Sequence, residues 1–217
     1  MTLERAPKHR AAPPEVARDL TKAVGPRRAP KAEASLMEAS KAFERERYGD
    51  ALVVLRSLAE DTPDVAAVRE LTGLCLYRQG KWSDALRQLE RFVELTGSVE
   101  QHPVIADCHR GLRHHDLVSQ LWEELAASSP SAELVAEGRI VMAGSLADQG
   151  RLRDAIALLE RAPLQTKRPR SHHLRLWYAL GDLYERAGDV PSAREWFARV
   201  LLHDAEMADT ADRLSHL

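Results

Sequence analysis

A short alanine-centred pattern returns five times along this chain at a nearly constant spacing. The repeated position falls at Ala51, Ala85, Val118, Ala155 and Ala193, so the steps are 34, 33, 37 and 38 residues. Periods of this size are typical of repeat proteins, in which each unit is a helical hairpin that cannot bury its apolar face alone. The spacing therefore predicts an all-α solenoid, which offers a binding surface rather than a catalytic pocket.

The composition is that of a globular protein without a membrane-spanning segment. Of the 217 residues, 44% are hydrophobic and 29% are charged. No run of about 18 apolar residues occurs, and residues 1–31 lack the apolar stretch of a secretory signal. The two cysteines, Cys75 and Cys108, are too few for a disulfide framework. We therefore expect a cytoplasmic protein with reduced, buried thiols and no membrane partner.

The net charge of −2 is unevenly distributed along the chain. Residues 1–31 carry eight Lys or Arg and three Asp or Glu, a net charge of +5, whereas the remainder carries −7. The same region contains five prolines, which interrupt long helices. We predict that residues 1–33 form a basic, proline-rich and largely flexible arm. Within it, residues 14–24 could form a short helix, because Val16, Leu20 and Val24 lie four residues apart.

The repeat domain is predicted to span residues 34–205, with a capping helix or tail at 206–217. Its helix–turn–helix units lie near residues 34–64, 65–98, 99–131, 135–168 and 172–205. The fifth unit has the clearest pattern, with Trp177, Leu180, Gly181 and Tyr184 on one helix and Ala193 and Phe197 on the next. Gly188 and Pro191 stand between them, where a helix end and a new first turn favour these residue types.

The pattern Trp-x-x-Leu-Gly-x-x-Tyr followed by Ala-x-x-x-Phe resembles the tetratricopeptide repeat signature. The resemblance covers about residues 34–205 and is strongest in the second and fifth units. It implies about five antiparallel helix pairs stacked into a right-handed superhelix. Members of this family bind protein segments on the first helix of each pair, which lines the inner curve of the superhelix.

The third unit departs most from the pattern. Val118 takes the alanine position, His109 takes an aromatic or leucine position, and the expected glycine before the second helix is missing. Trp122, Leu125 and Pro130 still keep the spacing. We interpret residues 99–131 as a distorted repeat rather than an interruption of the array.

No catalytic motif is present. The chain contains no G-x-S-x-G, G-x-x-x-x-G-K, H-E-x-x-H or G-x-G-x-x-G. We expect neither enzymatic activity nor a cofactor or small-molecule substrate.

One cluster, formed by Cys108, His109, His114 and His115, contains side chains that could bind zinc if they converged. Its spacing differs from that of a zinc finger, and we expect a packed cysteine beside turn histidines rather than a metal site. The predicted break between two helices falls among these residues, so their convergence stays open.

The partner-binding residues should lie on the first helices of the repeats. Aligning the units gives Glu70, Leu74, Tyr77, Arg78, Asp107, Arg110, Ile140, Tyr178, Asp182 and Glu185 as candidate groove residues. Leu74, Tyr77, Ile140 and Tyr178 are apolar anchors, and charges of both signs lie between them. A groove of this kind suits a peptide or helix, with apolar side chains giving affinity and charges fixing register.

The leading functional hypothesis is a non-catalytic adaptor or scaffold that binds a segment of a protein partner in this groove. Two other classes stay open. The basic arm could bind RNA, although the charge of −7 on the body opposes phosphate binding. The exposed ends of the solenoid could also support self-assembly. The sequence reveals neither the partner's identity nor the oligomeric state.

Overall fold

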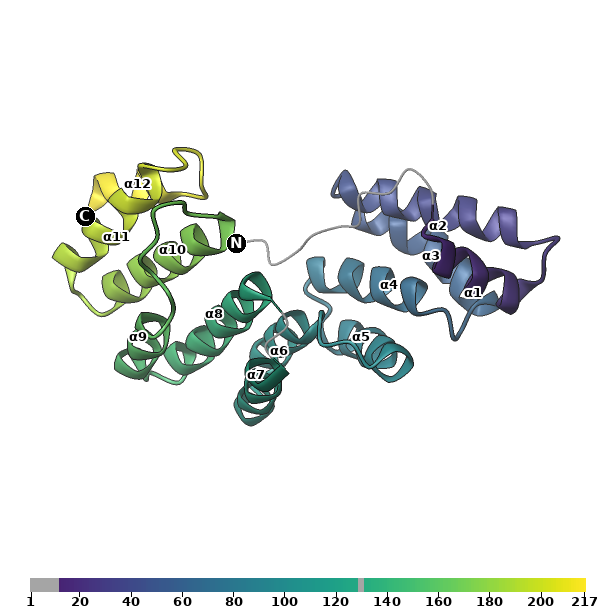
Figure 1. Ribbon diagram of the computed structural model, residues 1–217, viewed down its shortest axis with the longest axis horizontal. Helices are drawn as coiled ribbons and strands as arrows, with labels where there is room; N and C mark the ends of the chain where they lie inside the picture. The colour runs from purple at the N-terminus through teal and green to yellow at the C-terminus, as the bar shows by residue number, and fades with distance from the viewer. Residues whose placement is uncertain (1–11, 129–130) are drawn as a thin grey trace. The chain divides into compact units, whose positions relative to one another are not determined.

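The computed structural model describes residues 12–128 and 131–217, and within these ranges it contains twelve α-helices and no strand. The all-α helical-repeat architecture is therefore confirmed. In chain order the helices are α1 (Pro14–Val24), α2 (Ala29–Glu44), α3 (Tyr48–Asp61), α4 (Ala66–Arg78), α5 (Trp82–Thr96), α6 (His102–Gly111), α7 (His115–Ser128), α8 (Ala132–Asp148), α9 (Leu152–Glu160), α10 (Ser171–Arg186), α11 (Val190–Leu201) and α12 (Thr210–His216) (Figure 1). None of these helices is long and apolar enough to cross a bilayer.

The chain divides into two compact units between Leu112 and Arg113. The N-terminal unit holds α1 to α6, and the C-terminal unit holds α7 to α12 (Figure 1). The division falls inside the third predicted repeat, 99–131, which we expected to be distorted but uninterrupted. Each unit is a compact body with its own packed helices.

The turn between the two helices of a repeat contains a residue in the left-handed conformation. Gly80, Gly150 and Gly188 each lie five residues before the repeated alanine position and have positive φ angles of 70°, 78° and 78°. At the same position the first repeat has Glu46, with a φ angle of 58°, and the third has Arg113, with a φ angle of 63°. A side chain in the left-handed region costs about 1–2 kcal/mol, which glycine avoids. Both turns without glycine therefore carry this strain, and the turn at Arg113 adjoins the division between the units.

The repeated alanine position is buried in every repeat. The side chains of Ala51, Ala85, Val118, Ala155 and Ala193 are all fully buried. On the facing helix, glycine gives the closest approach. A Cβ atom built at Gly73 would lie 2.6 Å from Leu89 Cγ, and one at Gly181 would lie 2.6 Å from Phe197 Cε1. The spacing of small residues in the sequence therefore reflects where two helices touch.

The N-terminal unit begins earlier than the expected repeat domain. Residues 14–24 form α1, which packs against α2 and buries Leu20 and Val24. Helix α2 starts at Ala29, because Pro30 suits the first turn of a helix. Residues 14–24 therefore form a helix over the range that the spacing of Val16, Leu20 and Val24 suggested, and residues 29–33 already belong to α2. Residues 1–11 of that arm lie outside the described part of the chain.

The remaining helices of each unit pack in sequence. In the N-terminal unit α2 contacts α3, α3 contacts α4, α4 contacts α5 and α5 contacts α6. In the C-terminal unit α8 contacts α7, α9 and α10, while α11 packs against α10 and α12. The core of the C-terminal unit is centred on Trp177, whose indole Nε1 donates a hydrogen bond to the Leu164 carbonyl at 3.1 Å. The residues near 206–217 form a turn and the short helix α12.

Because α4 and α5 approach closely at Gly73, a methyl group added there should destabilise the fold. Gly73→Ala should lower the free energy of unfolding by about 1–3 kcal/mol, because Leu89 must move out of its packed position. Gly49→Ala is the matched control in the same unit. Its added Cβ would have only an ordinary contact, 3.7 Å from Gln79 Nε2, so stability should stay equal or rise by up to about 1 kcal/mol. Urea denaturation followed by circular dichroism measures both variants, and equal stabilities would contradict the packing described for Gly73.

Candidate partner-binding surfaces

All ten predicted groove residues lie on the first helices of the repeats. Glu70, Leu74, Tyr77 and Arg78 belong to α4, Asp107 and Arg110 to α6, Ile140 to α8, and Tyr178, Asp182 and Glu185 to α10. The structure brings them together in two separate groups, one in each unit. Several of them contact other residues of the chain rather than facing solvent alone.

In the N-terminal unit, Asp107 connects α4 to α6. Tyr77 Oη donates a hydrogen bond to Asp107 Oδ2 at 2.8 Å, and Arg110 Nε donates to Asp107 Oδ1 at 2.8 Å. The Asp107 side chain is only 13% exposed, whereas Arg110 keeps 35% of its side chain exposed. A largely buried carboxylate that accepts from both neighbours fixes their orientation. We call the residues Tyr77, Arg78, Asp107 and Arg110 the first-helix surface.

Arg78 is the second cation of the first-helix surface. Its Nη2 atom lies 3.6 Å from Glu46 Oε1, and its guanidinium group lies 4.8 Å from the centre of the Tyr48 ring. The side chain is 22% exposed. Both contacts come from the preceding helix pair, so Arg78 is held in place by packing and by charge.

The two other predicted groove residues of α4 differ in exposure. Leu74 is 2% exposed and belongs to the core rather than to a binding surface. Glu70 is half-buried and accepts a hydrogen bond from Gln101 Nε2 at 2.7 Å. Burial raises the pKa of Glu70, and this hydrogen bond lowers it by a smaller amount. Tyr77 is itself 9% exposed, so the accessible part of the first-helix surface comes chiefly from its two arginines.

In the C-terminal unit, the chain's own last helix covers the predicted residues. Arg213 of α12 donates from Nη2 to Asp182 Oδ1 at 2.9 Å and to Glu185 Oε2 at 2.5 Å, and from Nη1 to Tyr178 Oη at 3.2 Å. Its guanidinium group also lies 4.8 Å from the centre of the Phe197 ring. Burial works against the charged form of Arg213, but these hydrogen bonds raise its pKa overall. Tyr178, Asp182 and Glu185 are therefore occupied by an intramolecular contact.

A buried ion pair between α8 and α10 was not anticipated from the sequence. Arg175 Nη2 lies 2.5 Å from Glu137 Oε1, and Glu137 is 5% exposed. Burial raises the pKa of Glu137 to about 7, while the charge of Arg175 acts in the opposite direction. Charged residues usually mark solvated positions, so helical periodicity predicts an exposed Glu137. The sequence contained one signal for this ion pair. Arg175 occupies the same position in the fifth repeat as Glu137 does in the fourth, and the two side chains carry opposite charges.

The cysteine and histidine cluster offers no metal centre in the part of the chain that the structure describes. There, no group of three or more His, Cys, Asp or Glu side chains is placed to hold a metal ion. Cys108 is fully buried, and burial raises the pKa of its thiol to about 12. His115 Nδ1 lies 2.8 Å from Ser145 Oγ in the C-terminal unit. Cys108 is thus a packed thiol that stays protonated, which suits neither nucleophilic nor metal chemistry.

The raised pKa of Glu137 predicts a pH-dependent contribution to stability. The folded state holds this proton up to about pH 7, whereas the unfolded chain releases it near the ordinary value of 4.5. Stability from this group therefore falls as the pH rises from about 4.5 to 7. As the pH rises through that interval, the free energy of unfolding of Glu137→Gln should increase by about 1–3 kcal/mol relative to that of the unmodified protein. Urea denaturation at pH 5 and pH 8 measures the difference.

Glu133→Gln on the same helix is the control for this pH dependence. The pKa of Glu133 is lowered, chiefly by a backbone hydrogen bond. Its contribution to stability is present above the unfolded pKa and is lost on acidification, so the two variants should differ in the sign of their pH dependence. If the free energies of unfolding of Glu137→Gln and the unmodified protein changed with pH in the same way, Glu137 would be ionised throughout this pH range.

Comparison with known proteins agrees with this architecture. A family model for the tetratricopeptide repeat matches residues 36–98 and 141–209. The unmatched residues between them contain the divided third repeat and the strained turn at Arg113. No curated protein matches the sequence.

Several solved structures share the fold at low sequence identity. A thermophilic tetratricopeptide repeat protein of Thermus thermophilus has a TM-score of 0.65 and 17% identity, over 85% of this chain and 97% of that chain. MamA of Desulfovibrio magneticus has a TM-score of 0.60 and 17% identity, over 82% and 98% of the two chains. YrrB, a repeat protein with an unusual peptide-binding site, has a TM-score of 0.51 and 16% identity, over 93% and 100%. With the family model matching more than half of its residues, this chain belongs to the tetratricopeptide repeat family.

Proposed function

We propose that the chain is a non-catalytic adaptor that binds a segment of a protein partner on the first-helix surface of its N-terminal unit. Tetratricopeptide repeat proteins in general are protein-interaction modules, and YrrB illustrates that the fold can carry a peptide-binding site. Within the described ranges, no group of three or more His, Cys, Asp or Glu side chains is placed to hold a metal ion. The two free, buried cysteines support a reducing, cytoplasmic environment.

The observation that carries this proposal is the orientation of Arg110 by a largely buried carboxylate. Asp107 accepts hydrogen bonds from Tyr77 and Arg110, and Arg110 remains one-third exposed. A cation held in this way loses less side-chain entropy when it binds an acidic group of a partner. Arg78, on the neighbouring first helix, supplies the second partly exposed cation. The surface therefore suits a segment with acidic side chains.

The equivalent face of the C-terminal unit is a poorer binding surface. Tyr178, Asp182 and Glu185 are engaged by Arg213, so a partner would first have to displace α12. We therefore retain Tyr77, Arg78, Asp107 and Arg110 as the proposed contact residues and assign the α10 residues to intramolecular packing.

The proposal predicts that removal of two charges weakens partner binding without unfolding the protein. Arg78→Gln with Arg110→Gln is preferable to charge reversal, because a new acid would face Glu46 or Asp107 directly. Affinity capture from native lysate followed by quantitative mass spectrometry should then show at least about a tenfold loss of the specific partner, equivalent to 1.4 kcal/mol. Circular dichroism checks that the helical content is unchanged.

A double variant on the outer side of the same unit is the control. Arg56→Gln with Arg87→Gln removes two exposed charges from the second helices α3 and α5. It should capture the partner as well as the unmodified protein does. Equal capture by both double variants would remove the first-helix surface from consideration.

A further inference from the structure

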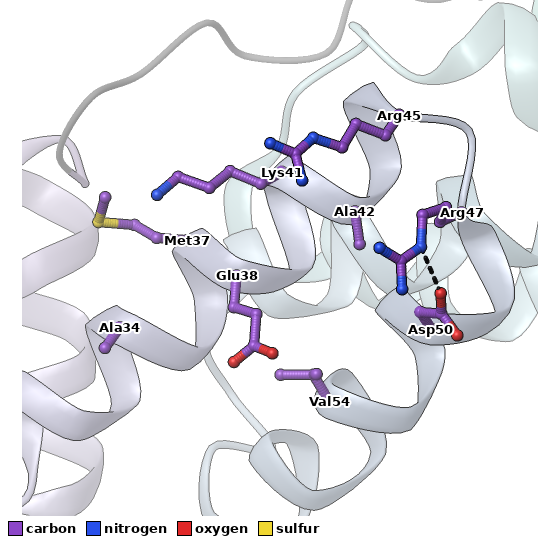
Figure 2. A pocket seen from close by; sticks show the side chains of 9 residues that line it. All are labelled: Ala34, Met37, Glu38, Lys41, Ala42, Arg45, Arg47, Asp50 and Val54. Carbon is purple, nitrogen blue, oxygen red and sulfur yellow. Dashed lines mark hydrogen bonds and ion pairs between the residues drawn. The ribbon is translucent and has the colours of Figure 1, made fainter.

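A hollow of about 400 Å³ lies between α2 and α3 in the N-terminal unit. Its apolar lining comes from Met37, Ala42 and Val54, and charged side chains surround this lining (Figure 2). The volume is near the lower end of the range for ligand-binding cavities. It is large enough for one or two apolar side chains of a docked segment.

The hollow follows from the unequal lengths of α1 and α2. Helix α1 has 11 residues and is about 16 Å long, whereas α2 has 16 residues and is about 24 Å long. The turn between them is short, so α1 packs along the beginning of α2 and ends before α2 does. The residues of α2 that line the hollow, from Ala34 to Arg45, extend to its far end. This part of the helix pair lacks the cover that a full-length preceding helix would give.

The charges around the hollow favour an acidic occupant. Arg47 Nε lies 2.6 Å from Asp50 Oδ2, so these two residues largely neutralise each other. Lys41 and Arg45 are exposed, and within the described residues neither side chain has a hydrogen bond or an ion pair. Figure 2 shows their side chains extending along one rim of the hollow, with Glu38 on the opposite side. With Arg47 and Asp50 neutralising each other, Lys41 and Arg45 outnumber the single remaining carboxylate, Glu38, so the surroundings of the hollow carry a net positive charge.

The chain's own N-terminal residues do not have the complementary charge. Residues 1–11 contain Arg5, Lys8 and Arg10 against Glu4. A basic segment would approach Lys41 and Arg45 with like charge, which is unfavourable. The charge pattern thus favours a separate acidic chain as the occupant.

We propose that this hollow is a second docking site, which binds an acidic amphipathic segment of a protein partner. An apolar side chain of that segment enters the hollow against Met37 and Val54, and neighbouring Asp or Glu side chains bind Lys41 and Arg45. Met37 has an unbranched, adaptable side chain, which fits apolar groups of different shapes. The proposed site does not use the contacts of Tyr77 and Arg110 with Asp107 on which the proposed function rests.

The test measures binding of short fluorescein-labelled peptides to the full-length protein by fluorescence anisotropy. A peptide of alternating leucine and glutamate is the probe, and peptides with lysine in place of glutamate, or serine in place of leucine, are the controls. We expect the leucine–glutamate peptide to bind best, with weaker binding at high ionic strength. Lys41→Glu with Arg45→Glu, and separately Met37→Ser, should each weaken binding by about tenfold or more.

Two further variants separate this site from the alternatives. Arg56→Glu changes an exposed charge on α3 outside the hollow and should leave peptide affinity within about twofold. Arg110→Gln should also leave it unchanged, because Arg110 is held by Asp107 on α6 and does not line the hollow. Loss of binding in that variant, with retention in Lys41→Glu, Arg45→Glu, would place the probe on the first-helix surface and overturn the second site.

Three other results would also contradict the second docking site. The first is equal binding of the glutamate and lysine peptides, or preference for lysine, because charge complementarity would then be absent. The second is no binding of any peptide. The third is self-association of the protein without peptide, seen as a concentration-dependent sedimentation coefficient and abolished in the Lys41→Glu, Arg45→Glu variant. A second copy of this chain would then be the occupant.

Discussion

The close contact between the two helices of each repeat is the constraint on which the other features depend. Gly73 against Leu89, and Gly181 against Phe197, leave no room for a methyl group. The residue at the repeated alanine position is fully buried in every repeat. Because the contact fixes which face of each helix is buried, it also fixes which face remains for binding. Protein interiors tolerate little change in volume, so the small residues recur while most others vary.

The same geometry explains why the predicted binding residues are partly occupied. Glu70 and Tyr178 are both fifteen residues before the repeated alanine position, and each contacts a residue 31 positions further along the chain, Gln101 and Asp209 respectively. Tyr77 and Glu185, eight residues before that position, likewise reach the next element, at Asp107 and Arg213. The first-helix face of one repeat is therefore also part of its contact with the following element. Residues on this face divide their exposed surface between packing and binding.

The sequence was sufficient to predict the helices but not how their side chains pair. The 33- to 38-residue spacing placed the helix pairs, because a buried small residue must recur wherever two helices touch. It did not locate the division after Leu112, since the first repeat also lacks the glycine, at Glu46, and lies undivided within the N-terminal unit. The periodicity placed Tyr178, Asp182 and Glu185 on α10 but did not predict their contact with Arg213, because a single charge on a short C-terminal helix carries no periodic signal. The hollow between α2 and α3 depends on the length of α1, which the proline-rich composition of that region obscured.

Helix α12 has the same relation to α10 that α6 has to α4. Tyr178 and Glu185 contact α12 or the residue before it, as Glu70 and Tyr77 contact α6 or the residue before it. Helix α12 is thus equivalent to the first helix of a further repeat whose second helix is absent from the described residues. Helix α12 is held on α10 mainly by Arg213, which makes three polar contacts and lies beside the Phe197 ring. These contacts take the place of the packing that a complete helix pair would provide. At the other end of the array, α1 covers only part of α2. Helix α12 thus covers the first-helix face of α10, whereas the hollow between α2 and α3 lies beside two cations that have no partner among the described residues.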